Sequence, residues 1–211
     1  DIKASESLVI VVRHPNHTDN EIVEAEARRV RAQGGRLIGL GLHETQVVAA
    51  IVSLQKRSQR AAGFLLEGIG LSLSITVSPI LDSIEQIGTE EAKAFKRAAR
   101  EAGMEPWEAL AEKRGEVLVA EHNVPSRLLR ATRALSVWTT AAQLNAGHAV
   151  VVSHHSGMEI EPAVALAIDR SMGKVAGLTD PTRYVPTAGM VLLWFSRSGS
   201  LSRSPLYLDP Q

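Results

Sequence analysis

Short runs of β-branched and aliphatic residues alternate along this chain with longer stretches in which apolar residues recur every three or four positions. The short runs predict buried strands and the longer stretches predict helices. Strands that are apolar throughout are typical of a parallel sheet covered by helices on both faces. The sequence therefore predicts an α/β fold, a three-layer α/β/α sandwich with a mostly parallel, doubly wound sheet. We expect strands at 7–14, 74–79, 116–121, 148–154 and 189–196, and helices at 20–33, 44–57, 60–69, 83–103, 105–114, 125–145 and 158–172.

The chain shows no repeat, linker or low-complexity block, which favours a single domain over residues 1–211. With 45% hydrophobic and 22% charged residues, its composition is that of an ordinary globular protein. A Gly-Gly pair at 34–35 is expected to end the first helix. The tail at 197–211 is rich in Ser and Pro and is expected to form a loosely attached edge.

The balanced charge and the absence of cysteine exclude several classes of function. The 23 Lys and Arg residues balance 23 Asp and Glu, so no overall field attracts nucleic acid or an anionic membrane. The apolar runs are shorter than the ~20 residues that span a bilayer, and the first residues lack the layout of a signal peptide, so we expect a cytoplasmic protein. The absence of Cys excludes disulfides and thiol nucleophiles, and leaves His, Ser, Thr, carboxylates or a bound metal for catalysis.

Two of the expected strands end in histidine. The stretch "LVIVVRHP" (8–15) places Arg13 and His14 after the first strand, and "HAVVVSHHSG" (148–157) places His154 after a later one. The carboxyl ends of parallel strands form the edge where ligands collect, and the helix N-termini there favour anions. The forked guanidinium of Arg13 matches phosphate oxygens. The pattern predicts a phosphate site with two imidazoles, with hydrogen-bonded structural histidines as the alternative.

These stretches resemble a known family. "LVIVVRHPNHTDN" resembles the "RHG" opening of the histidine phosphatase superfamily, which includes the phosphoglycerate mutases, and "HAVVVSHHSG" resembles its later "VVSHGG". Three further stretches follow in the family's order. They resemble its "LTxxGxxQA" segment, its "SSPLxRAxQTA" segment and the region of its acidic proton donor, at 36–50, 75–88 and 119–125.

The resemblance implies a phosphohistidine mechanism that needs no cofactor. In it His14 attacks phosphorus, Arg13 and His154 bind the phosphoryl oxygens, and Glu121 at the end of an expected strand protonates the leaving oxygen. A neutral imidazole is a usable nucleophile at neutral pH, and cationic donors aimed at the equatorial oxygens supply most of the catalysis.

The resemblance also suggests secondary site residues. Asn20 matches the family's "RHGxTxxN" asparagine and would bind a phosphate oxygen, or would cap the helix expected after it. His155 stands in the turn that the family builds from glycines and is a further substrate-binding candidate. Glu116 and Glu112 are fallbacks for the proton donor.

Three features depart from the family's pattern. Pro15 replaces the glycine after Arg-His and removes an N–H. His155 and Ser156 enlarge a turn that is small elsewhere in the family. Aligning "SPILDS" on "SPLxRA" puts Asp82 where the family has its second phosphate-binding arginine, and a carboxylate there would repel phosphate. Arg57 or Arg60 could compensate.

Two functions follow. The first is a phosphomonoester hydrolase, preferred over a mutase, that acts on a small phosphorylated substrate or another anion. The second is a catalytically impaired family member that acts as a binding or regulatory module. A metal site built from His14, His17, His154 and His155 is a weaker reading, because no carboxylate stands at ligand spacing, and we expect none. The basic clusters at 56–60 and 127–133 predict solvated helix faces, not a nucleic-acid surface. A homodimer is left open.

Overall fold

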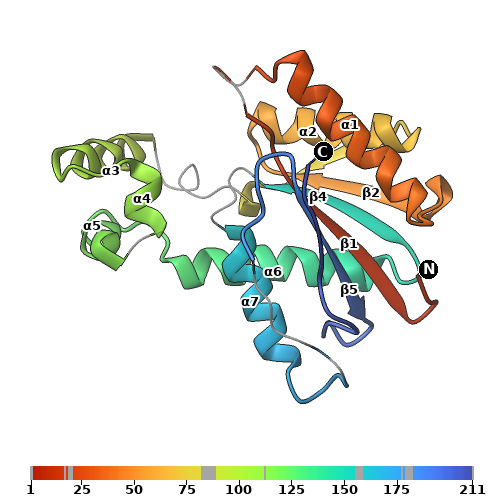
Figure 1. The fold of residues 1–211 in the computed structure, drawn as a ribbon. Helices are drawn as coiled ribbons and strands as arrows, with labels where there is room; N and C mark the ends of the chain where they lie inside the picture. Colours follow the sequence, from red (N-terminus) through yellow and green to blue (C-terminus); the bar gives the residue numbers. More distant parts are fainter. Residues whose placement is uncertain are drawn as a thin grey trace.

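A six-stranded sheet forms the centre of the computed structural model (Figure 1). The structure describes residues 2–16, 18, 21–81, 89–111, 113–154, 159–176, 178 and 183–210. The strand order is β3-β2-β4-β1-β5-β6. The first four strands in this order are parallel, β5 runs antiparallel to β1, and β6 runs antiparallel to β5. The strands are β1 (Glu6–Arg13), β2 (Val47–Val52), β3 (Ile75–Val77), β4 (Ala149–His154), β5 (Met190–Ser196) and β6 (Leu206–Leu208).

Helices cover both faces of this sheet, which confirms the predicted α/β/α sandwich with a mostly parallel sheet. On one face, α1 (Glu24–Gly39) and α2 (Lys56–Ile69) pack on the alternate strand residues that include Ile10 and Val151. On the other face, α6 (Arg127–Leu144) and α7 (Ile160–Ser171) pack on the residues between them. The central strands are therefore buried on both sides, which is why β1 and β4 read as continuous apolar runs.

The two helices on the first face cross in close contact. A Cβ added to Gly34 of α1 would lie 2.5 Å from the Leu65 carbonyl oxygen, and one added to Gly68 of α2 would lie 2.1 Å from the Arg31 carbonyl oxygen. Only glycine allows the two backbones to approach so closely. The predicted stop at 34–35 was therefore wrong: Gly34 lies inside α1, which begins and ends later than expected.

Three helices form a cluster beyond the sandwich, next to the N-terminal end of α6 (Figure 1). They are α3 (Thr89–Glu101), α4 (Pro106–Ala111) and α5 (Glu116–Glu121), and Phe95 and Val119 belong to their small separate core. Since α6 precedes β4 and leads into its amino end, the N-terminal end of α6 and this α3–α5 cluster lie toward the carboxyl edge of the sheet. Short 3₁₀ turns are η1 (Glu44–Gln46), η2 (Pro79–Leu81) and η3 (Lys113–Gly115).

Two predicted elements have the wrong type. The helix expected at 44–57 is η1 followed by strand β2, and the strand expected at 116–121 is helix α5. The tail contributes β6, whose Leu208 is buried, so part of it is firmly attached. Within the described residues, no helix has the length and apolar character that crossing a bilayer requires.

Candidate anion-binding site

Arg13 and His154 are paired neighbours at the ends of the parallel strands β1 and β4. One guanidinium nitrogen of Arg13 donates to the Val185 carbonyl at 2.8 Å, and the guanidinium carbon lies 4.9 Å from the centre of the Tyr184 ring. The Nε of Arg13 is buried and has no hydrogen-bond partner among the described residues. The structure thus brings together these two residues from distant parts of the sequence, as predicted from their strand ends.

His154 is completely buried against α6. Trp138, also fully buried, donates its indole N–H to Nε2 of His154 at 2.9 Å, with the two rings edge to face. Because an indole only donates, Nε2 is an acceptor and the proton of the neutral imidazole is on Nδ1. Burial lowers the pKa of His154 to about 3. His154 is therefore a neutral donor, and its buried Nδ1 finds no partner among the residues that the structure describes.

His14 follows β1 directly and is half-buried. Its Nδ1 lies 2.8 Å from the Pro15 carbonyl oxygen, which can only accept, so Nδ1 carries the proton. In the neutral ring the lone pair is then on Nε2. Pro15, which lacks an N–H, still provides the carbonyl that fixes this tautomer.

Arg57 is a functional candidate that sequence reasoning left unplaced. It lies in the first turn of α2, directly after β2, and β2 is the other neighbour of β4 in the sheet. The next residue, Ser58, donates its hydroxyl to the His154 carbonyl at 2.9 Å and accepts from Ser53. Arg57 therefore stands at the same sheet edge as Arg13 and His154. Arg60 instead forms an exposed ion pair with Glu21.

The strand order bears on which segment corresponds to the family's "SSPLxRAxQTA" motif. The β2–α2 junction at 52–62 lies next to β4, whereas the 75–88 stretch begins with β3, the outermost strand of the sheet. Arg57 therefore follows a strand that pairs directly with β4, whereas β3 is separated from β4 by β2. The missed signal was the apolar run 47–52, which was interpreted as part of a helix.

Glu161 is a second residue that the sequence analysis did not single out. It lies in the first turn of α7, and one of its carboxylate oxygens accepts from the Val185 N–H at 2.9 Å. Burial raises the pKa of Glu161, while the Val185 N–H and the charges of Arg13 and Arg127 act in the opposite direction. The backbone of Val185 therefore connects Glu161, which accepts from its N–H, to Arg13, which donates to its carbonyl.

The other predicted residues lie elsewhere or outside the described part. Glu121 is exposed at the end of α5, in the α3–α5 cluster. Glu116 lines a cavity beside that cluster. Within the described residues, no group of three or more His, Cys, Asp or Glu side chains could hold a metal ion. The predictions that fall outside the described residues are those on Asn20, Asp82, Glu112, His155 and His17.

The structure is an α/β/α sandwich with Arg13 and two imidazoles at one strand edge, and solved structures share this fold. The protein histidine phosphatase SixA, solved with tungstate, is 12% identical, covers 96% of this chain and 97% of its own, and has a TM-score of 0.58. A mycobacterial hydrolase is 16% identical over 98% of this chain and 100% of its own, with a TM-score of 0.55.

A mycobacterial glucosyl-3-phosphoglycerate phosphatase solved with VO3 is 17% identical, covers 88% of this chain and 92% of its own, and has a TM-score of 0.53. Neither a family model nor a curated protein matches this sequence. The chain has the phosphoglycerate mutase-like fold of these phosphatases, which is the fold that its motifs led us to expect.

Proposed function

We propose that this protein is a phosphomonoester hydrolase that works through a phosphohistidine on His14. The observation that carries the proposal is the pair of buried donors, Arg13 Nε and His154 Nδ1, at paired positions of β1 and β4. A buried donor without an acceptor is costly, and two such donors side by side favour an anionic ligand. The structural relatives solved with tungstate and VO3 support the same chemistry.

The chemistry runs in two steps. The lone pair on Nε2 of His14 attacks phosphorus while the bond from phosphorus to the ester oxygen breaks, and that oxygen takes a proton from a carboxylic acid. Water then attacks the phosphohistidine, gives a proton to the carboxylate, and releases phosphate and the free imidazole. Arg13, His154 and Arg57 bind the three equatorial oxygens, where the charge of the transferring group resides.

Glu161 is the proton donor that the geometry favours. One of its oxygens is held by the Val185 N–H, so the other is available to carry the proton, and burial raises the pKa of the carboxyl group. A raised pKa keeps a general acid protonated closer to neutral pH. Glu121, which the family resemblance implies, is exposed on α5 and is the competing candidate.

Arg57 also weakens the case for the impaired alternative. That alternative rested on Asp82 in place of a second phosphate-binding arginine, and Arg57 supplies a cation at the β2 end of the same edge. A mutase would need a pocket that retains the phosphorylated intermediate, and no observation favours one.

The test follows turnover of p-nitrophenyl phosphate from pH 4 to pH 8 by the wild type and by the His14→Ala and Asp82→Arg variants. We expect turnover in the wild type, none in His14→Ala, and a rapidly quenched wild-type sample that holds acid-labile, base-stable phosphate on histidine. Turnover that survives in His14→Ala would overturn the mechanism. A silent wild type with an active Asp82→Arg variant would establish the binding or regulatory module instead.

A further inference from the structure

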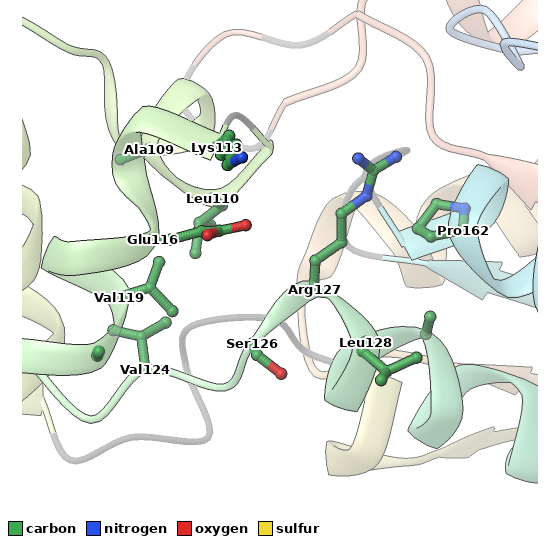
Figure 2. Close-up of a pocket in the computed structure, with 12 residues that line it drawn as sticks. Ala109, Leu110, Lys113, Glu116, Val119, Val124, Ser126, Arg127, Leu128 and Pro162 are labelled. Atoms are coloured by element: carbon green, nitrogen blue, oxygen red, sulfur yellow. The ribbon is translucent and has the colours of Figure 1, made fainter.

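A cavity of about 630 Å³ lies between the α3–α5 cluster and the N-terminal ends of α6 and α7. Figure 2 shows its two walls, with Glu116, Val119 and Val124 on one side and Arg127 and Pro162 on the other. Its volume is in the range of sites that hold small molecules. The described residues that line it are Ala109, Leu110, Lys113, Glu116, Val119, Ala120, Val124, Ser126, Arg127, Leu128, Ala131 and Pro162.

Most of this lining is aliphatic, and apart from Ser126 its polar residues are charged. The side chains of Lys113, Glu116 and Arg127 form no hydrogen bond or ion pair with any other described residue. Figure 2 shows the side chains of Glu116 and Arg127 extending from opposite walls into the space between them. Two cations face one carboxylate, so the cavity favours an apolar ligand that carries an anionic group.

The cavity adjoins the phosphate site through the start of α7. Pro162 lines the cavity and directly follows Glu161, whose carboxylate is connected to Arg13 through the backbone of Val185. Arg127 lines the cavity too, and its charge reaches the same Glu161 carboxylate. Glu161 therefore lies between this wall of the cavity and the arginine at the end of β1.

Building on the hydrolase function proposed above, we propose that this cavity holds the leaving group. The substrate is then a phosphomonoester of a largely apolar alcohol, an alkyl or aryl chain, that carries a second anionic group bound by Arg127 and Lys113. The aliphatic walls bind the alkyl or aryl part of the substrate. The positive charges of Lys113 and Arg127, which exceed the one negative charge of Glu116, bind its second anionic group.

The first arm of the test measures kcat/KM for unbranched alkyl phosphates from ethyl to octyl. We expect an increase of about threefold per added methylene until the cavity is filled, because each methylene leaves water for an apolar wall. Ala120→Trp should abolish this increase, since Ala120 is exposed on α5 and lines the cavity. Val117→Trp is the matched control, because Val117 is exposed on the same helix and does not line the cavity.

The second arm compares each alkyl phosphate with its ω-carboxylated counterpart. In the wild type the carboxylate should raise kcat/KM about tenfold for chains that reach Arg127, as expected for a charge-assisted hydrogen bond. Arg127→Gln should bring the ratio of the two substrates close to one. Taking the ratio within each variant cancels any effect of Arg127 on the chemical step.

The outcomes separate this proposal from the function on which it rests. If the wild type turns over ethyl phosphate but kcat/KM is flat with chain length, the hydrolase stands and the leaving-group cavity is wrong. If nothing is turned over, calorimetry with octylphosphonate decides. Binding to the wild type that is lost in Ala120→Trp supports the cavity as a site for apolar anions, and no binding to the wild type overturns it.

Discussion

The indole N–H of Trp138 donates to Nε2 of His154 at 2.9 Å, deep in the layer between α6 and the sheet. This bond assigns the imidazole proton to Nδ1 and fixes the plane of the ring. A residue with no place in any catalytic motif thus sets which atom of His154 can donate to a ligand.

Trp138→Phe keeps a buried ring but removes the donor. We expect kcat/KM for p-nitrophenyl phosphate to fall 10- to 100-fold, and ¹⁵N NMR of the imidazole to show a mixture of tautomers where the wild type shows a single one. Leaving a buried acceptor unpaired should also cost about 1–3 kcal/mol of stability. Trp194→Phe, the same change on the opposite face of the sheet, is the control. An unchanged tautomer in Trp138→Phe would show that the bond does not set it.

His154 also predicts how stability depends on pH. Burial lowers its pKa to about 3 in the folded protein, against about 6.5 in an unfolded chain, so the unfolded state binds the extra proton between these values. The contribution of the neutral ring to the free energy of unfolding is fully present above pH 6.5. Between pH 6.5 and pH 3 it decreases by about 1.4 kcal/mol per pH unit of acidification. Urea unfolding from pH 4 to pH 7.5 should show a shallower dependence in His154→Gln. Parallel curves would mean that His154 does not titrate on unfolding.

Arg57→Ala and Arg60→Ala form a matched pair one helical turn apart on α2. We expect at least a 100-fold loss of kcat/KM in Arg57→Ala, because a cation aimed at the transferring phosphoryl group is removed. Arg60 is exposed and paired with Glu21, so Arg60→Ala should stay within about threefold of the wild type. Equal losses in the two variants would place the second phosphate cation elsewhere in the chain.

Glu161→Gln separates proton donation from positioning. The amide oxygen of Gln can still accept from the Val185 N–H, but the side chain cannot give a proton to the leaving oxygen. We expect alkyl phosphates to slow 10²- to 10⁴-fold while p-nitrophenyl phosphate, whose leaving group needs little protonation, slows much less. The same measurements on Glu121→Gln test the alternative donor, and a selective loss there instead would transfer the role to Glu121.

Arg130 connects the α3–α5 cluster to Glu159, the residue before α7. It is buried, donates to the carbonyls of Leu110 and Pro125, and lies 3.4 Å from a carboxylate oxygen of Glu159. Arg130→Met should cost about 3–5 kcal/mol in urea unfolding, because a buried carboxylate loses its cation. Adding Glu159→Gln should recover part of that loss. A double variant no more stable than the single one would show that Arg130 acts through the two carbonyls alone.

The sequence predicted the parts of the site that depend on strand burial. Arg13, His14 and His154 follow runs buried on both faces, and their placement at one sheet edge needed only the parallel topology. The segment 47–52 was predicted to be helical because Val47, Ala50 and Ile51 recur at helical spacing, but it forms strand β2. Because of that one error, the sequence analysis did not place Arg57 at the end of a strand next to β4.

The strand predicted at 116–121 failed for a different reason. Val117 and Val119 are β-branched, but this preference is weak, and packing of Val119 in the small core of the α3–α5 cluster overrides it. Glu161 carried no sequence signal, because its partner is the backbone of Val185, which only the folded chain brings near. Nothing in the helix pattern indicated the bond of Trp138 to His154.

The contact between α1 and α2 has a consequence for finding relatives of this chain. At Gly34 and Gly68 a Cβ would overlap the backbone of the facing helix, so a side chain is forbidden at either position whatever chemistry the strand edge performs. Residues of a catalytic motif can be substituted, as Pro15 illustrates. The steric requirement for glycine remains as long as the two helices cross. A profile weighted on these two glycines should therefore detect distant homologues that the histidine motifs alone would miss.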